Sequence, residues 1–250
     1  MEFVEIPPGR FLMGAARYKP APGRFLREQT RVEPDAQPMH IVYITRPFFL
    51  GVTEITERQR MIVEIAAGKI DPEEYGIPVR SAEDYRTYVT KDKKPVPESF
   101  ASWEEANELI ETLSRIDPDY DYRMPTEAEW EYACRGQVDS IDYSRVDAEV
   151  TQPRLETARC APPNSFGLYD MLRNMGEFCS DWYSRDYYAH SPLANPTGPP
   201  TGGAKVARGV RDEGGGWYAA WRRYPVGPEA DGNILLGVRL VLEPEGRVRR

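Results

Sequence analysis

The chain has 250 residues, enough to bury a full hydrophobic core as one large domain or two small ones. Its net charge of −8 argues against a general role in binding the nucleic-acid backbone. We expect no membrane insertion, because no apolar stretch is long enough to span a bilayer and the N-terminus has no signal-peptide pattern. The three cysteines lack framework spacing and indicate a reducing compartment, so the cytoplasm is the default location. Surface display or secretion by a route without a signal peptide stays open.

The N-terminal half of the chain alternates short strands with helices that begin at capping residues. Thr56 with Gln59 and Thr126 with Glu129 have capping-box spacing, and Ser102 with Glu105 follows the same pattern. The expected strands are 3–6, 10–13, 40–45 and 48–54, and the expected helices are 57–67, 103–115 and 127–134. Between these elements we expect a long polar loop over 17–38 and a charged, proline-spaced irregular segment over 70–97.

Two stretches in the middle of the chain are the most specific part of the sequence. They read YRMPTEAEWEYACRG at 122–136 and NSFGLYDMLRNMGEFCSDWY at 164–183. Most of their apolar residues also suit plain core packing, and the specificity lies in the ordered pair. With the PPGRFLMG opening, VTEIT and SWEEANELI, the chain resembles the formylglycine-generating-enzyme (sulfatase-modifying factor) family over roughly its whole length. The resemblance implies an α+β, C-type-lectin-like fold with low regular secondary structure, as a single domain over 1–250.

The sequence favours calcium over a transition metal. His40 and His190 are the only histidines and lie far apart, so we expect no zinc or iron site. Asp170, Asn174 and Glu177 gather in an irregular segment, where hard oxygen ligands can converge on Ca²⁺.

The family resemblance assigns ligands to this calcium site. It implies the side chains of Asp170 and Glu177 and the backbone carbonyls of Arg173 and Met175, although the family usually has glycine at the position of Arg173. The alternative is a salt bridge between Arg173 and Glu177 without metal. For the family's other calcium site, expected between residues 136 and 162, the chain has no matching sequence.

The segment that holds the catalytic cysteines in the family contains none here. That segment lies between an RGG-like strand and a GFR-like strand, which correspond to Ala207-Arg208-Gly209 and Gly237-Val238-Arg239. Cys134, Cys160 and Cys179 all lie outside it. A copper-dependent thiol oxidase therefore cannot be built in the usual place, and we expect no copper site and no catalytic residues.

In place of the cysteines, the segment 206–241 carries aromatic residues among glycines, alanines and arginines. Large rigid aromatics with small and charged neighbours are typical of binding surfaces. The alternative is that some of these aromatics belong to the core. The candidate ligand-binding residues are Arg211, Asp212, Trp217, Tyr218, Trp221, Arg223, Tyr224, Asp231 and Asn233.

Three functions remain open at this point. Variable proteins of diversity-generating retroelements place their mutagenised residues in this last segment of the same fold, so the first is a non-catalytic protein that binds an unknown protein or small-molecule ligand. The second is an enzyme of the sulfatase-modifying-factor family with a relocated or lost active site. The third is an accessory domain of a larger assembly.

Overall fold

Two four-stranded sheets form the centre of the molecule. The computed structural model describes residues 1–15, 34–76, 84, 95–136, 148–149, 155–210, 217–227 and 234–244. Of residues 148, 149, 217, 218 and 244 it describes the backbone alone. The predicted loop 17–38 and the predicted irregular segment 70–97 therefore lie largely outside the described residues.

The first sheet joins the two ends of the chain. Its strand order is β1 (Phe3–Ile6), β4 (Phe48–Gly51), β12 (Val241–Pro244) and β5 (Tyr120–Arg123), with antiparallel neighbours throughout. The central strands β4 and β12 supply the fully buried Leu50 and Val241. The C-terminal strand is thus held between segments from the first half of the chain.

The second sheet carries the C-terminal segment. Its order is β10 (Tyr224–Val226), β8 (Lys205–Arg208), β7 (Gly176–Trp182) and β11 (Leu236–Gly237). β11 runs parallel to β7, whereas the other neighbours are antiparallel. Gly176 at the start of β7 allows close packing, because a Cβ atom there would lie 2.5 Å from Val210 Cγ2. The sequence 206–241 is therefore tied to the core at both ends, by β8 and β11.

Two short ribbons complete the strands. β2 (Gly9–Met13) pairs with β3 (His40–Ile44), and β6 (Ala148–Glu149) pairs with β9 (Trp217–Tyr218). The predicted strand 3–6 is confirmed, and the predicted strands 10–13, 40–45 and 48–54 are confirmed with shifted ends. The largest difference is in the last of these, which ends at Gly51.

The three predicted helices are confirmed within one residue. They are α1 (Glu57–Ala66), α4 (Trp103–Ile116) and α5 (Glu127–Arg135). The structure adds the short helix α2 (Pro72–Tyr75) and two 3-10 turns, η2 (Pro34–Ala36) and η4 (Tyr187–Ala189). Both predicted capping boxes form at Thr56 and Thr126. At α4 the Ser102 hydroxyl accepts from the backbone N–H of Glu105, but Glu105 itself accepts from the backbone N–H of Ala101.

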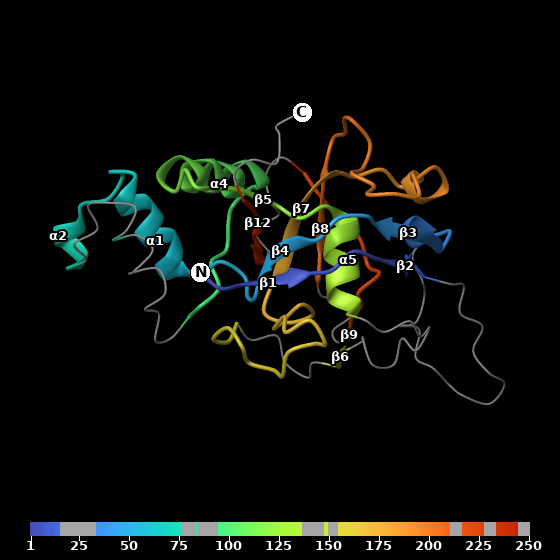
Figure 1. Cartoon of the computed structure of the whole chain (residues 1–250), viewed down its shortest axis with the longest axis horizontal. Helices are drawn as coiled ribbons and strands as arrows, with labels where there is room; N and C mark the ends of the chain where they lie inside the picture. The colour runs from blue at the N-terminus through green and yellow to red at the C-terminus, as the bar shows by residue number, and fades with distance from the viewer. Residues whose placement is uncertain are drawn as a thin grey trace.

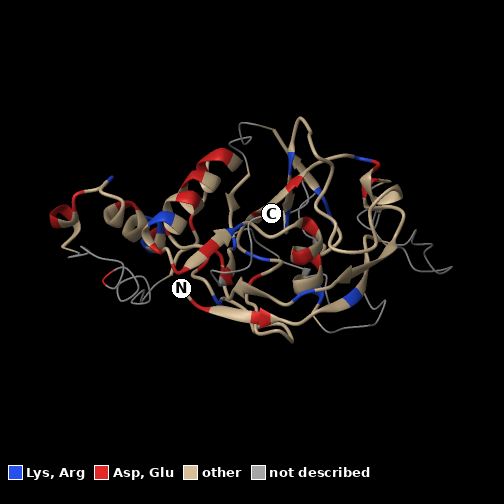
Figure 2. Ribbon diagram, turned by 45° about the horizontal axis from the view of Figure 1, so that its top comes forward, with Lys and Arg blue, Asp and Glu red and all other residues tan. Residues whose placement is uncertain are grey.

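The helices cover the sheets on different sides. α1 and α4 pack on each other and, with α2, occupy one end of the molecule, while α5 packs against β2, β3, β7 and β8 (Figure 1). Acidic residues occur along the whole of α4, beginning with Glu104 and Glu105 in its first turn (Figure 2). The arrangement is the α+β architecture that the sequence predicts. Among the described residues no helix is long and apolar enough to cross a membrane.

The core consists of two apolar clusters. One lies around α5 and includes Trp130, Leu168 and Val206, and the other lies around α1 and α4 and includes Ile62, Leu113 and Phe178. Buried charged residues lie beside both clusters, which is unusual because ionised groups lose hydration on burial. These charged residues organise the candidate site.

Candidate ligand-binding surface

Strand pairings hold the C-terminal segment 206–241 in place, in addition to that of β11 with β7. β8 pairs with β7, β9 pairs with β6 from another part of the chain, and β10 folds back antiparallel on β8. In Figure 1 the strands β6 and β9 lie together along one edge. We call the described residues that hold the segment 206–241 against the rest of the molecule its fixed points.

Trp221 is one of the fixed points. Its side chain is 8% exposed and packs with Ala219, Ala15 and Ala36. Ala15 and Ala36 flank the residues 16–33 and are joined by a backbone hydrogen bond of 2.9 Å from Ala15 N–H to the Ala36 carbonyl. The prediction that Trp221 contacts a ligand is wrong for this structure, and the alternative of a core aromatic applies, because its indole is buried beside Ala15 and Ala36.

Arg223 is the second fixed point, and its guanidinium is also buried. It donates to both oxygens of Glu127, at 2.6 and 3.0 Å, and to the backbone carbonyls of Asp35 and Ser184, at 3.1 and 2.9 Å. The rings of Tyr183 and Tyr188 lie 4.9 and 4.4 Å from its central carbon. The prediction that Arg223 faces a ligand is therefore wrong for this structure, since all of these contacts are internal.

The other predicted binding residues divide into two groups. Tyr224 is partly buried and packs against the cluster around α1 and α4. The remaining positions are outside the described residues or have only their backbone described: Arg211, Asp212, Trp217, Tyr218, Asp231 and Asn233. Their assignment to the binding surface stays a prediction.

A buried cluster of ion pairs lies beneath the segment. Arg208 is fully buried and donates to Glu127 Oε1 at 2.7 Å and to Glu131 Oε2 at 2.6 Å. It also donates to the Tyr188 hydroxyl at 3.2 Å and to the Ala220 carbonyl. Because Ala220 belongs to the C-terminal segment, this arginine joins the segment directly to α5. We call the residues Glu127, Glu131, Arg208 and Arg223 the Glu127 centre.

The electrostatics of this centre favour ionised carboxylates. Burial opposes the charge on Glu127, but the positive charges of Arg223 and Arg208 and their hydrogen bonds hold its pKa below the ordinary value. Glu131 has a further partner in Arg135, which lies one helical turn later and donates to Oε1 at 2.5 Å. Buried ions are tolerated here because each carboxylate has more than one donor.

Sequence reasoning missed the Glu127 centre. Glu127 and Glu131 are four residues apart on α5, so they share a face with the apolar residues that contact the core. That spacing, together with an arginine in the strand at 208 and another just before a strand at 223, is the signal that could have revealed buried ion pairs.

The three thiols lie outside the C-terminal segment in sequence, although Cys179 is buried in one cluster with Val206 and Ala220 of that segment. Burial raises the pKa of Cys134 to about 12 and that of Cys179 well above its ordinary value. Cys160 is partly exposed, and burial and its hydrogen bond to Asp170 raise its pKa to about 12. Because the thiolate is the nucleophile and metal ligand, none of these thiols is poised for reaction at neutral pH.

The residues predicted to bind calcium are engaged by donors of the protein itself. Glu177 pairs with Arg239 and accepts the indole N–H of Trp130 at 2.6 Å. Asp170 accepts from backbone N–H groups of Arg159 and Cys160 and from the Cys160 thiol. No group of three or more His, Cys, Asp or Glu side chains suited to a metal ion occurs among the described residues. This arrangement does not fit a calcium ion.

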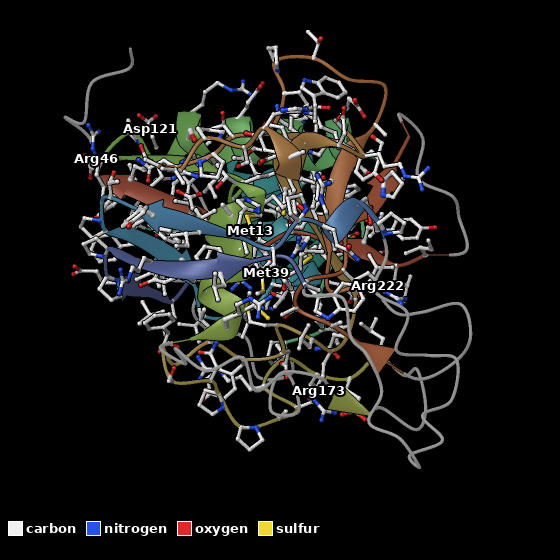
Figure 3. All side chains as sticks on the ribbon, turned by 90° about the vertical axis from the view of Figure 1, so that its right-hand side faces the viewer. Met13, Met39, Arg46, Asp121, Arg173 and Arg222 are labelled. Carbon is white, nitrogen blue, oxygen red and sulfur yellow. The ribbon has the colours of Figure 1, made fainter. Side chains whose placement is uncertain are left out.

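The other residues of that set are placed as follows. Met175 is buried, and Arg173 is partly exposed at the same end of the molecule as β6 and β9 (Figure 3). The alternative salt bridge between Arg173 and Glu177 is wrong, because residues 171–175 are not helical and Glu177 pairs with Arg239.

The fold and the site define a lectin-like α+β domain without thiols in its C-terminal segment. Residues 1–243 match the Sulfatase-modifying factor enzyme 1-like domain family, and the chain belongs to this family. The formylglycine-generating enzyme of Streptomyces coelicolor is 30% identical over 82% of this chain and 77% of that protein. The serine/threonine-protein kinase pkn1 of Chlamydia pneumoniae is 31% identical over 75% of this chain, and the match spans 31% of the kinase.

Solved structures show the same fold. The structure of PvdO from Pseudomonas aeruginosa has a TM-score of 0.63 at 19% identity, covering 96% of this chain and 94% of that one. Treponema denticola variable protein 1 has a TM-score of 0.61 at 19% identity, covering 97% and 95%. The two similarities support the lectin-like architecture.

Proposed function

We propose that this chain is a non-catalytic ligand-binding protein that presents its C-terminal segment 206–241 on a lectin-like scaffold. The observation that carries the proposal is the absence of cysteine between Arg208 and Arg239, in a family whose oxidases keep reactive thiols there. The ligand class is a protein or a small molecule, and the protein type is the variable protein of a diversity-generating retroelement.

The thiols elsewhere support the non-catalytic assignment. A copper-dependent oxidase needs a thiolate pair within reach of the metal and the substrate. Cys134 and Cys179 are buried, and Cys160 donates a hydrogen bond to Asp170, so each is held in the thiol form. Relocating the active site to these residues would require burying a thiolate at considerable cost.

The fixed points of the segment support a role in presentation. Trp221 and Arg223 contact the core, and their backbone neighbours in β10 are paired with β8. A rigid scaffold lets nearby residues change without unfolding the domain. The candidates for contact with a ligand are therefore the remaining predicted positions, Arg211, Asp212, Trp217, Tyr218, Asp231 and Asn233.

The similarity to the Streptomyces enzyme favours one alternative, an enzyme of the sulfatase-modifying-factor family with a relocated site. The purified chain with copper and a cysteine-containing sulfatase peptide discriminates between the two functions. We expect no aldehyde above the control without protein. Aldehyde formation that is lost in Cys160→Ser would establish a relocated active site and overturn the proposal.

The retroelement assignment has a separate test in the gene. Diversification through an adenine-copying template leaves changes at adenines of the template, so we expect a second, related copy of the coding sequence for 206–241 beside a reverse-transcriptase gene. Differences between the copies should fall on the codons of the candidate contact residues and spare Trp221 and Arg223. A locus with neither the repeat nor the reverse-transcriptase gene would contradict this assignment.

A further inference from the structure

A single buried arginine, Arg239, pairs with Glu177, one of the side chains that the family resemblance assigns to calcium. Arg239 precedes β12 and is fully buried. It donates to Glu177 Oε1 from Nη2 at 2.8 Å and from Nε at 3.2 Å, and to Glu177 Oε2 from Nε at 3.2 Å. It also donates to the carbonyls of Gly51 at 3.0 Å and Tyr169 at 2.8 Å. The guanidinium is thus enclosed by oxygen atoms from three separate parts of the chain.

Glu54 completes this enclosure. Its side chain is buried, its Oε2 lies 3.7 Å from Arg239 Nη2, and neither of its oxygens has a hydrogen-bond partner. We call Glu54, Glu177, Arg239 and the carbonyls of Gly51 and Tyr169 the Arg239 centre. Two carboxyl groups and two carbonyls are hard oxygen groups of the kind that bind cations, and here the cation belongs to the protein.

The geometry of Glu177 excludes sharing with calcium. Calcium requires about 6–8 oxygen ligands at about 2.3–2.6 Å. Both Glu177 oxygens already accept charged or indole N–H groups. Moving one of them to a metal would leave a buried guanidinium or indole donor without its partner, which is unfavourable.

We infer that Arg239 and Trp130 together occupy both carboxylate oxygens of Glu177, so the folded chain takes no Ca²⁺ at Asp170–Glu177. The Arg239 centre is a binding site for a guanidinium group, and the arginine side chain of the protein itself occupies it. Two consequences follow. Calcium does not change the stability of the wild-type protein through this site. Removal of the Arg239 side chain leaves a cavity that fits a free guanidinium ion.

The first experiment is a calcium titration of the wild-type protein. Thermal unfolding is followed in millimolar CaCl₂, in MgCl₂ at the same concentration and in EDTA. We expect the same melting temperature in all three. A rise specific to calcium that disappears in Asp170→Asn overturns the inference. Asparagine suits this control because residue 170 has φ +58°, a backbone conformation that asparagine adopts more readily than most residues.

The second experiment restores the missing cation to Arg239→Ala. Alanine keeps Cβ, so N-ethylguanidinium replaces the deleted atoms. We expect a lower melting temperature than in the wild type and a rise of several degrees in millimolar N-ethylguanidinium, but no rise in ethylammonium at the same concentration. Rescue by calcium and not by N-ethylguanidinium overturns the inference.

Arg123→Ala is the matched control for this rescue. Arg123 pairs with Glu129 and Glu243, but its side chain is 34% exposed, so its removal leaves no enclosed hole. N-ethylguanidinium should leave its melting temperature unchanged. If Arg239→Ala does not fold without additive, its refolding is compared with and without N-ethylguanidinium. The inference is contradicted if the variant fails to refold in both conditions and calcium raises the melting temperature of the wild type.

Discussion

The Glu127 centre and the Arg239 centre are both buried clusters of ion pairs, but they differ in their charge balance. In the first, Arg208 and Arg223 face two carboxylates, each of which accepts several hydrogen bonds. In the second, one arginine faces two carboxyl groups, and Glu54 has no hydrogen-bond partner. Burial raises the pKa of Glu54 to about 8, so this group keeps its proton at neutral pH.

The difference shows how this chain uses buried charge in two ways. The Glu127 centre joins α5 to the C-terminal segment and, through Arg223, to the carbonyls of Asp35 and Ser184. The Arg239 centre joins β7 to the sheet that holds the two chain ends. The first therefore holds the middle of the segment 206–241 against α5, whereas the second holds the end of the same segment, at Arg239, against the scaffold.

The largest expected effect comes from Arg208→Met. This change leaves Glu127 and Glu131 buried with fewer donors, and breaking a buried pair in this way costs about 3–5 kcal/mol. Urea unfolding measures the loss. Arg123→Met removes the partly exposed arginine of β5 and should cost less than about 1 kcal/mol. Equal losses in the two variants would show that the Glu127 centre contributes no more than a surface pair.

A smaller and more local effect is expected for Arg223→Met. Glu127 keeps Arg208 and Tyr188 as donors, so we expect a loss of about 1–3 kcal/mol. Hydrogen exchange should accelerate at the amides of 219–226 and remain slow in β7, because the lost contacts attach the segment to α5. Arg222→Met is the control, since the neighbouring guanidinium makes no contact with Glu127. Uniform acceleration across the protein would contradict a local anchoring role.

Much of the fold could be predicted from local sequence signals. Thr56 and Thr126 fix the starts of α1 and α5 through side-chain bonds within four residues, and such contacts depend on the local sequence alone. The sequence predicts a strand that continues to Glu54, whereas β4 ends at Gly51. An acidic residue after an apolar run gives no indication that its side chain is buried. Glu54 is buried by residues distant in sequence, including Arg239.

The candidate site was less predictable for the same reason. Trp221 and Arg223 have the composition of a binding surface, and only the contacts with Ala36 and Glu127 show that they face inward. An aromatic or an arginine suits both a paratope and a buried anchor, so residue type cannot separate them. The absence of cysteine between 208 and 239 is a property of the sequence itself and needed no structure.

The smallest expected effect concerns pH and the N-terminus of α5. Asp181 accepts from the backbone N–H of Glu127 at 2.9 Å, and burial, assisted by the charge of Glu127, raises the pKa of Asp181 to about 7. Between its unfolded pKa of about 4 and about 7, the folded protein holds a proton that the unfolded chain releases. The free energy of unfolding should therefore fall as the pH rises through this range and level off above it.

Asp181→Asn tests this contribution to the Glu127 centre. Asparagine can still accept the Glu127 N–H but does not titrate, so the decrease in unfolding free energy from about pH 5 to about pH 8 should be smaller than in the wild type by about 2 kcal/mol. Urea unfolding at the two pH values measures it. Asp186→Asn serves as control. The hydrogen bond from Ser184 lowers the pKa of Asp186 below its ordinary value, so Asp186 stays ionised throughout this range. An identical pH dependence in wild type and Asp181→Asn would show that Asp181 is ionised in the folded protein, which would place an additional negative charge beside the balanced Glu127 centre.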